Sequence, residues 1–442
     1  MMMKSPLFKK ALSSQGLNHQ QLIETFKELN HVVFLNNNNA PILGFLADDY
    51  ICITPQQTKI LQQTEFNQYH AYPSAKDLDH FLNLTHEHPT LTMGFLSYDF
   101  AAQQQISLNK KQQPSIFLGH FSHYLSFENQ TWYFNSFHKN AENIYTYINE
   151  LTIKKPSSSI LSLHHTCIPR WSKAAYSNAF QQVQDYILAG DCYQINLTQE
   201  FTTTAQGTLL STSEDFWTLT NAPYAGYLKI DEFELLSCSP ELFIDFESER
   251  KIITKPIKGT MPRYSDPIKD ENSKQALINS EKDRAENVMI VDLLRNDLSV
   301  YAEIGSVKTP KLFNIESFNQ VHHMVSEIEA VLKPNIKPFD VLMSALPGGS
   351  ITGAPKIRAM QIIDELEEAP RGAYCGSMGY FDTDGCGSWN ILIRSIQKYQ
   401  QDISVWAGGG ITIASNCDAE YQECFDKVSA ILNLLNTWHK PS

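Results

Sequence analysis

The pattern of hydrophobic and polar positions changes partway along the chain. Up to residue 155, short alternating segments such as 50–54 and 91–98 are mixed with helical stretches, and no chemical signature is concentrated there. The polar segment 154–159, which contains a proline, predicts a linker. We therefore expect two domains, an N-terminal domain over residues 1–160 and a core over residues 165–437.

The core begins with a predicted helix and strand. Ser172 is suited to cap a helix with one apolar stripe, and Gly190 is suited to end it. Residues 193–198 alternate apolar and polar side chains, which predicts a half-buried strand. Further strands are expected at 234–237, 243–246, 251–254, 376–381, 389–396 and 403–407, and further helices at 283–295, 355–367 and 418–436. This mixed order predicts an α+β fold built on a large, mostly antiparallel sheet.

The composition of the 442-residue chain is that of an ordinary globular protein, with 42% hydrophobic and 19% charged residues. Its net charge of −13 argues against a nucleic-acid partner, and it means that an anionic substrate would need local cations. We expect no membrane span, since no apolar run approaches the roughly 18–20 residues required. Eight scattered cysteines and a start without an apolar leader predict a cytoplasmic protein with reduced thiols.

Two pairs of carboxylates are spaced so that each pair lies on one face of a predicted helix. Asp283 and Glu286 are three residues apart. Glu420 and Glu423 have the same spacing, and Lys427 follows one turn later on the same side. Taken alone, such a pair is most often a solvated helix face. The alternative is that both pairs converge on a hard cation such as Mg²⁺, which prefers oxygen ligands, and spacing leaves both interpretations open.

Other positions also carry possible chemistry. Lys258 lies between a strand-like run and a turn; it fits a surface lysine, or a buried amine whose lowered pKa makes it nucleophilic. The glycine-rich loop 346–356 lacks the ending of a nucleotide-binding loop, but a helix start can hold a carboxylate. The cluster 407–410 fits a tight turn or the close approach of an anion. His323 fits a core histidine, and Cys375 a buried thiol.

Taken together, these segments resemble the chorismate-utilising enzymes, which include the anthranilate, aminodeoxychorismate, isochorismate and salicylate synthases. The resemblance covers residues 170–437 and rests on blocks in the same order and at similar spacings. The blocks are GDCYQINL at 190–197, SPE at 239–241, PIKGT at 256–260, DRAENVMIVDLLRND at 283–297, PGGSITGAPKIR at 347–358, and 407–427. The resemblance implies an anthranilate-synthase-like fold, a large antiparallel β-sandwich flanked by helices with an N-terminal domain packed on it.

Within this group, the lysine at position 258 is the discriminating residue. Aminodeoxychorismate synthases typically have PIKGT, whereas anthranilate synthases typically have alanine there, and the N-terminal LLES signature of the latter is absent. The chain is therefore most similar to component I of the aminodeoxychorismate synthases. The similarity implies Mg²⁺-dependent amination of chorismate at C4, giving 4-amino-4-deoxychorismate in the route to 4-aminobenzoate and folate.

The resemblance also implies partners and leaves alternatives. We expect a separate glutamine amidotransferase subunit to supply ammonia, because the sequence leaves no room for a fused one. The nearest alternative is component I of anthranilate synthase, which attacks C2 and eliminates pyruvate itself; Lys258 argues against it. A second alternative is a regulator that binds chorismate without turning it over, which the full set of candidate residues disfavours.

Catalytic roles follow from the same resemblance. Lys258 would attack C2 of chorismate as the C4 hydroxyl leaves, and ammonia would then enter at C4 and displace the lysine. Glu241 would protonate the departing hydroxyl, which is a poor leaving group as hydroxide. The acid therefore needs a raised pKa and the amine a lowered one, a separation that enzymes achieve by burial and by neighbouring charge.

The remaining candidates would hold the metal and the substrate. Glu286 and Glu423 would bind Mg²⁺ directly, with Asp283 and Glu420 in a supporting role, partly through water. A cation here turns four repelling acids into a binding site for an anionic substrate. The substrate ring and its carboxylates would be contacted by His323, Thr352, Tyr380, Arg394, Gly409, Gly410 and Lys427.

Overall fold

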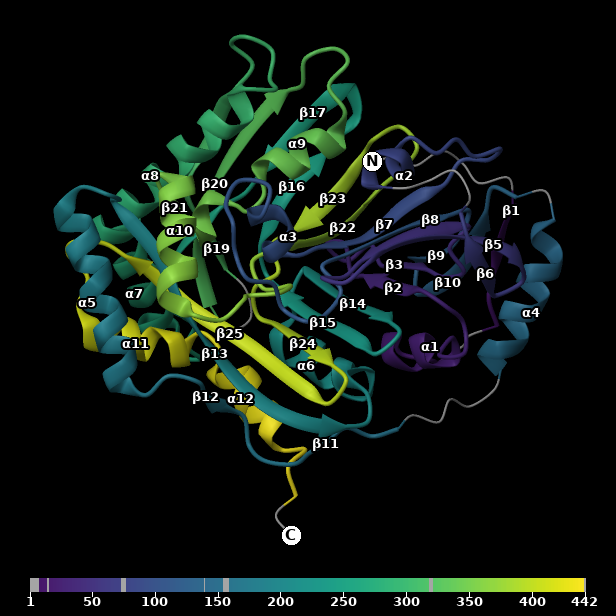
Figure 1. Ribbon diagram of the computed structural model, residues 1–442, viewed down its shortest axis with the longest axis horizontal. Coiled ribbons are helices and arrows are strands. Elements are labelled where there is room, and N and C mark those ends of the chain that lie inside the picture. Colours follow the sequence, from purple (N-terminus) through teal and green to yellow (C-terminus); the bar gives the residue numbers. More distant parts are fainter. Residues whose placement is uncertain are drawn as a thin grey trace.

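Two large β-sheets form the centre of the molecule, and helices surround them (Figure 1). The computed structural model describes residues 8–13, 16–72, 77–138, 140–153, 159–317 and 321–440. Every pairing between named strands is antiparallel in these residues, which confirms the predicted α+β class. Residues 154–158 of the predicted linker lie outside the described residues.

The first sheet draws its strands from both ends of the chain. In spatial order its strands are β1 (Phe8–Ala11), β10 (Thr131–Ser136), β9 (His123–Glu128), β3 (Ile42–Gly44), β2 (Val32–Leu35), β14 (Tyr224–Ile230), β15 (Phe233–Ser239), β24 (Ser395–Tyr399), β25 (Asp402–Ile411), β13 (Gln194–Gln206) and β11 (Ser162–Leu163), while β12 (Ile168–Pro169) and β21 (Gly353–Ala354) pair with β13. Strands β13 and β25 form a long pair near one end of this sheet, in which residues 195–204 pair with residues 402–411.

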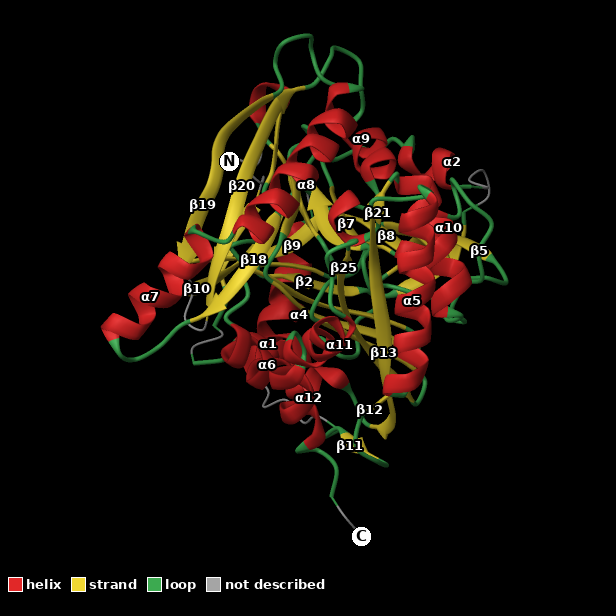
Figure 2. Cartoon of the chain, turned by 90° about the vertical axis from the view of Figure 1, so that its left-hand side faces the viewer, coloured by secondary structure: helices red, strands yellow, loops and turns green. Residues whose placement is uncertain are grey.

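The second sheet is built in the same way. In spatial order its strands are β18 (Ile257–Pro262), β20 (Val321–Val331), β17 (Lys251–Thr254), β16 (Leu242–Phe246), β23 (Gly387–Asn390), β22 (Ser377–Phe381), β7 (Leu91–Leu96), β8 (Ile116–Phe121), β4 (Asp49–Ile53), β5 (Thr58–Glu65) and β6 (Gln68–Ala71), while β19 (Lys308–Ser317) pairs with β20. One end of this sheet, β18–β20, lies beside α8 (Glu281–Ser299), which carries the first of the two acidic pairs (Figure 2).

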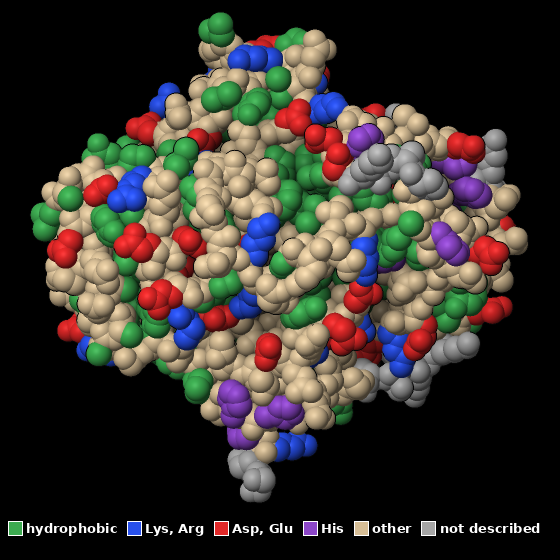
Figure 3. All heavy atoms as spheres, viewed as in Figure 1, with side chains coloured by type: hydrophobic (Ala, Val, Ile, Leu, Met, Phe, Trp, Pro, Cys, Tyr) green, Lys and Arg blue, Asp and Glu red, His purple; other side chains and the backbone are tan. Residues whose placement is uncertain are grey.

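The helices vary in length and cover the sheet faces and ends. They are α1 (His19–Thr25), α2 (Leu78–Leu82), α3 (Tyr98–Ala102), α4 (Ala141–Ile153), α5 (Lys173–Ala189), α6 (Ser213–Thr220), α7 (Pro267–Ile278), α8 (Glu281–Ser299), α9 (Pro338–Ala345), α10 (Lys356–Glu367), α11 (Cys417–Asp426) and α12 (Ser429–Asn436). Among the described helices, none combines the length and apolar character needed to cross a membrane. On the face shown in Figure 3, acidic and basic side chains are interspersed.

An apolar layer joins the two sheets face to face. Val33 of β2 and Leu228 of β14 belong to the same buried cluster as Met93 of β7. Phe95 of β7 stacks on Phe233 of β15, with ring centroids 5.3 Å apart. Burial of such side chains stabilises the sandwich, since each contributes roughly 1.5–3 kcal/mol when fully removed from water.

Both sheets contain strands from before residue 160 and after residue 165. Strand β2 pairs with β14 in the first sheet, and β7 pairs with β22 in the second. The division into domains at 1–160 and 165–437 stays a prediction about folding units. The hydrogen bonds of these two strand pairs connect the two predicted domains.

The first helix and strand of the core show how far local patterns carry. Helix α5 begins after Ser172, whose side chain accepts from the Ala175 amide, and ends at Gly190 in the left-handed conformation, as predicted. The predicted strand at 193–198 is β13, but it is buried on both faces rather than half-buried. The polar side chains on the second face are covered by later segments of the chain: Asn196 donates to the Ile351 carbonyl at 3.1 Å, and Glu367 Oε1 accepts from the Thr198 amide at 2.9 Å and from the Thr198 hydroxyl at 2.7 Å.

Two predicted elements are each broken into two. The helix expected at 418–436 is α11 and α12, because the chain bends at Val428 so that α12 packs into the core below the first sheet. The strand expected at 389–396 is the end of β23 and the start of β24. The chain crosses from the second sheet to the first between them, and Arg394, with a φ of 50°, lies at this crossing.

Candidate active site

A cavity of about 450 Å³ lies beside β18, β20 and β25 and is closed by α8 and α11. Its volume falls in the range of about 300–1,000 Å³ that is usual for small-molecule sites. Most of the candidates named from the sequence line it: Glu241, Lys258, Asp283, Glu286, His323, Arg394, Gly410, Glu420, Glu423 and Lys427. The fold therefore brings together residues from seven separate segments of the chain.

The two acidic pairs face this cavity from different helices. Helix α8 carries Asp283 and Glu286 and is capped by Ser280, whose side chain accepts from the Asp283 amide at 3.2 Å. Helix α11 carries Glu420 and Glu423. Because residues three apart share one side of a helix, each helix presents both of its acids to the cavity. The alternative of two solvated faces does not hold for Glu420, which is 3% exposed.

Two lysines lie among these acids. Lys282 of α8 reaches Glu286 at 3.9 Å and Glu420 of α11 at 3.7 Å, so its ammonium spans the two acidic helices. Lys427 donates to Glu423 Oε1 at 2.7 Å and to the Gly408 carbonyl at 2.8 Å. Within the cavity the positive charge needed to offset the acids is therefore supplied by side chains.

The pKa values of these carboxylates are shifted in different directions. Burial raises the pKa of Glu286, and Lys258 and Lys282 oppose that rise. Burial also raises the pKa of Glu420, against a hydrogen bond from Ser415 at 2.8 Å. Burial would raise the pKa of Glu423 as well, but Lys427 outweighs it and the pKa lies below its usual value. Crowded acids with raised pKa values favour a bound cation, which would stabilise their ionised forms.

The donor set fits a hard divalent cation. Four carboxylates from α8 and α11 supply the oxygen ligands that Mg²⁺ prefers. In the described part of the chain, no three of these acids have ligand atoms within 4.8 Å of one another. That spacing suits an ion that keeps several waters and takes further oxygens from a bound anion, as Mg²⁺ commonly does.

An acid and an amine with oppositely shifted pKa values occupy the same cavity. Glu241, 6% exposed between β15 and β16, has its pKa raised to about 7 by burial, with Lys258 opposing the rise. Lys258 of β18 has its pKa lowered by burial and then by Lys427, while Glu286 and Glu241 act against the lowering. The Lys258 ammonium donates to the Ser350 carbonyl at 3.1 Å. Near neutral pH, Glu241 can hold a proton and Lys258 can lose one more readily than a surface lysine.

A histidine and an arginine complete the wall beside the amine. His323 of β20 is 3% exposed, and burial followed by the charge of Arg394 lowers its pKa to about 3. Its Nδ1 lies 2.8 Å from the hydroxyl of Thr260, the residue that pairs with it across β18 and β20. His323 is thus a neutral imidazole at neutral pH, while Arg394 supplies a cation to the cavity wall.

The glycines of β25 allow α11 to lie directly on the strand. A Cβ at Gly409 would come 2.9 Å from Glu420 Oε2 and 3.0 Å from Glu423 Oε1. A Cβ at Gly410 would come 1.9 Å from Nε2 in the side chain of Gln194. The glycine cluster is therefore part of a strand and not a turn, and it allows other groups to approach the backbone closely. The groups that approach Gly409 are the carboxylates of Glu420 and Glu423.

Three candidates do not line the cavity. Tyr380 is buried in β22, and its hydroxyl accepts from Asn37 at 3.4 Å in a separate small pocket between the sheets. Thr352 is fully buried, and its hydroxyl donates to the Gly348 carbonyl at 3.0 Å. Gly409 lies just behind the acids. The predicted substrate contacts of these residues stay predictions.

Other cavity residues were missed from the sequence. Tyr374 and Trp406 line the cavity and stack on each other, with ring centroids 5.9 Å apart. Nothing in the spacing of two isolated aromatic residues marks them. Lys282 carried a usable signal, since it precedes Asp283 and lies one turn before Glu286 on the same helix.

Comparison with known proteins agrees with this geometry. Residues 31–433 match the family described as chorismate binding enzyme. The chain belongs to that family. It is 46% identical over 282 residues to aminodeoxychorismate synthase component 1 of Klebsiella aerogenes, covering 64% of this chain and 62% of the relative. It is 48% identical over 264 residues to the protein of the same name from Escherichia coli strain K12, covering 60% and 58%.

The matched stretch thus spans about six-tenths of each of these curated relatives. Solved structures resemble this chain in fold over most of its length. Anthranilate synthase component I from Streptococcus pneumoniae superimposes with a TM-score of 0.75 at 24% identity, covering 88% of this chain and 91% of that one. The menaquinone-specific isochorismate synthase of Escherichia coli gives 0.74 at 16% identity, covering 98% and 96%. At these identities the likeness concerns the fold, which is the anthranilate-synthase-like fold expected from the sequence.

Proposed function

We propose that this chain aminates chorismate at C4 to give 4-amino-4-deoxychorismate, as component I of an aminodeoxychorismate synthase. The single observation that carries the proposal is the pairing of Lys258 and Glu241, with opposite pKa shifts, in one cavity edged by four acids. The relatives that bear this name are 46% and 48% identical over the matched stretch.

Glu241 is the proposed acid. The C4 hydroxyl of chorismate leaves as water only if it receives a proton, and a group with a pKa near the working pH is the most effective donor. Burial of Glu241 raises its pKa to about 7, so a large fraction carries the proton at neutral pH. Loss of that proton to the departing oxygen leaves a carboxylate that Lys258 and Arg394 can stabilise.

Lys258 is the proposed nucleophile. Its lone pair would form a bond to C2 while the two conjugated ring double bonds each shift by one position and the C4–O bond breaks. Ammonia would then bond to C4 as both double bonds return and the C2–N bond to Lys258 breaks, which restores the free amine. The lowered pKa of Lys258 increases the fraction of neutral amine that can start this sequence.

The remaining cavity residues are proposed to bind the substrate and its counter-ion. Glu286 and Glu423 would hold Mg²⁺ directly, with Asp283 and Glu420 in support. Bound there, Mg²⁺ would neutralise one substrate carboxylate and fix its orientation. The second carboxylate needs another cation, and Arg394, which also lines the cavity, is the candidate.

Lys427, at the end of α11, and Gly410 of β25 both line the cavity, where they would bind the carboxylate that Mg²⁺ neutralises. His323, held neutral by burial, would contact the substrate ring without adding charge. Ammonia is proposed to come from a glutamine amidotransferase partner. The word component in the relatives' names is consistent with a further subunit.

Product identification tests the proposal. The purified chain is incubated with chorismate, Mg²⁺ and an ammonium salt, with and without an added aminodeoxychorismate lyase. We expect 4-amino-4-deoxychorismate without the lyase and 4-aminobenzoate with it. Fluorescent anthranilate formed without a lyase would assign the chain to C2 amination instead, and no turnover of chorismate would favour a binding protein.

A further inference from the structure

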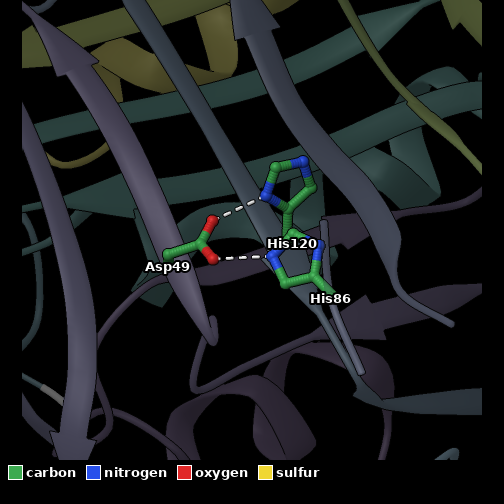
Figure 4. Close-up of side chains that lie close together, drawn as sticks. All are labelled: Asp49, His86 and His120. Atoms are coloured by element: carbon green, nitrogen blue, oxygen red, sulfur yellow. Dashed lines mark hydrogen bonds and ion pairs between the residues drawn. The ribbon is translucent and has the colours of Figure 1, made fainter. Parts of the chain in front are cut away.

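A second cluster of potential metal ligands lies away from the cavity, in the second sheet. Asp49 begins β4, and His120 is its direct partner across β8, so both side chains emerge side by side on one face. His86 comes from the connection between α2 and β7 and lies over the same place (Figure 4). The ligand atoms of these three residues all lie within 4.8 Å of one another.

Both oxygens of one carboxylate are directed at an imidazole. Asp49 Oδ1 lies 2.6 Å from His120 Nδ1, and Asp49 Oδ2 lies 2.6 Å from His86 Nε2 (Figure 4). Phe81 stacks on His120 with ring centroids 4.4 Å apart, which fixes the orientation of that ring. Ligand atoms from three segments therefore lie close enough together to share one ion, and the ring of His120 is held by packing.

The charges of this cluster favour a cation. Asp49 is 4% exposed, and its ion-pair partners are His86 and His120, which carry charge only when protonated. The neighbouring Asp48 is a half-buried acid that accepts hydrogen bonds from the amide and the hydroxyl of Ser122. A divalent ion bound by Asp49 would supply positive charge beside these two adjacent carboxylates in place of a protonated His86.

The identity of the donors selects the class of metal. One carboxylate with two imidazoles suits a borderline ion such as Zn²⁺, whereas Mg²⁺ and Ca²⁺ prefer oxygen donors alone. Bonds of about 2.0–2.2 Å in a tetrahedral site place neighbouring ligand atoms about 3.4 Å apart, so the 2.6 Å contacts between Asp49 and the rings would have to lengthen by less than about 1 Å. His86 can do so, because its side chain is 19% exposed on a connecting segment.

We propose that Asp49, His86 and His120 form a Zn²⁺-class site that fastens the connection 83–90 to the second sheet. Three protein ligands leave one position for water on the exposed side of His86, which also gives the ion its way in. None of the three residues lines the cavity described above. The site is therefore independent of the proposed reaction, and metal bound here acts on stability.

The experiment uses the full chain, stripped with a chelator, desalted and loaded with Zn²⁺ or Co²⁺ alone. We expect one equivalent to be retained after a second desalting, and we expect bound Co²⁺ to absorb visible light as a tetrahedral centre. Thermal unfolding should move to a higher temperature with added Zn²⁺, since a ligand that binds the folded state stabilises it. A large excess of Mg²⁺ should not displace the Zn²⁺.

Variants identify the ligands. His86→Ala should lose the retained equivalent and the thermal shift, and Asp49→Asn should do the same. The matched control is His88→Ala, two residues along the same connection, whose ring packs against His138 rather than Asp49. His88→Ala should keep both the retained equivalent of Zn²⁺ and the thermal shift. If Asp49→Asn fails to fold, His86→Gln at the exposed ligand carries the test, with circular dichroism as the check on folding.

The opposite results would overturn the site. Zn²⁺ retention equal in the unaltered chain and His86→Ala would mean that the three side chains form only a hydrogen-bonded set. Equal losses in His88→Ala and His86→Ala would place the metal elsewhere on the histidine-rich connection. A thermal midpoint that Zn²⁺ leaves unchanged would contradict the fastening role.

Discussion

At the scale of single residues, position in the fold gives ordinary side chains their chemistry. Glu241 and Lys258 would be fully ionised on a surface, but burial in one cavity moves the pKa of the acid up and that of the amine down. Their opposite shifts share a first cause, because loss of water penalises the charged form of each. Neighbouring charges then decide how far each pKa moves.

The raised pKa of Glu241 predicts the pH dependence of the reaction. Its protonated form is needed and is lost as pH rises through about 7, so kcat/KM should fall above that pH. Glu241→Gln should lower kcat/KM roughly 100-fold or more and remove this limb. The profile is measured at constant free ammonia, because ammonium itself deprotonates as pH rises. A profile that is flat from pH 6 to 8 at constant free ammonia would contradict the assignment.

Lys258 is predicted to be essential to amination at C4. Lys258→Ala should reduce formation of 4-amino-4-deoxychorismate roughly 100-fold or more, because the attacking amine is lost. Chromatography of the products would also reveal any amination at C2. The matched control is Lys255→Ala, three residues earlier in the chain, where the side chain pairs with Glu327 at 3.5 Å outside the cavity. Unchanged product formation in Lys258→Ala would refute the covalent role.

At the scale of elements, two helices and one strand create the acidic centre. Helices α8 and α11 each present two acids, and the glycines of β25 let α11 lie close enough for its pair to reach the cavity. Each helix alone would display a solvated acidic face. Packing turns the two faces toward one volume, where repulsion is relieved by lysines or by a bound cation.

Lys282 is predicted to compete with a divalent ion for the acids of α8 and α11. Lys282→Gln removes an ammonium 3.7 Å from Glu420 and 3.9 Å from Glu286, so Mg²⁺ affinity should rise severalfold. Stability without metal should fall by less than about 1 kcal/mol, because the lysine is largely exposed. Calorimetric titration with Mg²⁺ and thermal unfolding measure the two effects. Lys229→Gln, on the exposed side of β14, should change neither, and weaker Mg²⁺ binding in Lys282→Gln would contradict the prediction.

Gly409→Ala is predicted to damage the site more than the fold. The new Cβ would lie 2.9–3.0 Å from carboxylate oxygens at the ends of flexible side chains, which can move aside. We expect a thermal midpoint within a few degrees of the unaltered chain, but Mg²⁺ binding and turnover reduced at least tenfold. Thermal unfolding and Mg²⁺ titration of the same preparation separate the two. Normal Mg²⁺ affinity would show that the acids do not need this approach.

At the scale of the whole molecule, the chain is a sandwich to which both ends contribute. Strand β14 is hydrogen-bonded to β2, and β22 is hydrogen-bonded to β7. Phe95 and Phe233 pack against each other between the sheets. The cavity lies in the later part of the chain, yet the sheets that hold its residues are completed by the earlier part. Long-range pairing of this kind ties the two predicted domains together.

We therefore predict that residues 165–437 expressed alone do not form a stable unit. The fragment would expose the edges of β14 and β22 and one face of the apolar layer, which favours aggregation. Size-exclusion chromatography and binding of a hydrophobic dye compare the fragment with the full chain. A monomeric fragment with a single cooperative unfolding transition would show instead that the core folds by itself.

The sequence by itself determined the local features of this protein. It predicts the cap and end of α5 and the positions of β13, β15, β16, β17, β22 and β25. It also places two acids on one face of α8 and of α11. These features follow from local signals along the chain, with periods of two residues in strands and 3.6 in helices. The blocks of the later part also carried the resemblance to the chorismate-utilising enzymes, and the family is confirmed.

Only the tertiary structure decided which of those features meet. The burial of β13 on both faces, the bend between α11 and α12, and the separation of Tyr380 from the cavity depend on partners far away in the sequence. The cluster of Asp49, His86 and His120 has no short motif, because its members are brought together by strand register and a connection. The physical reason is that periodicity is a local property, whereas desolvation and charge interactions sum over every neighbour in space.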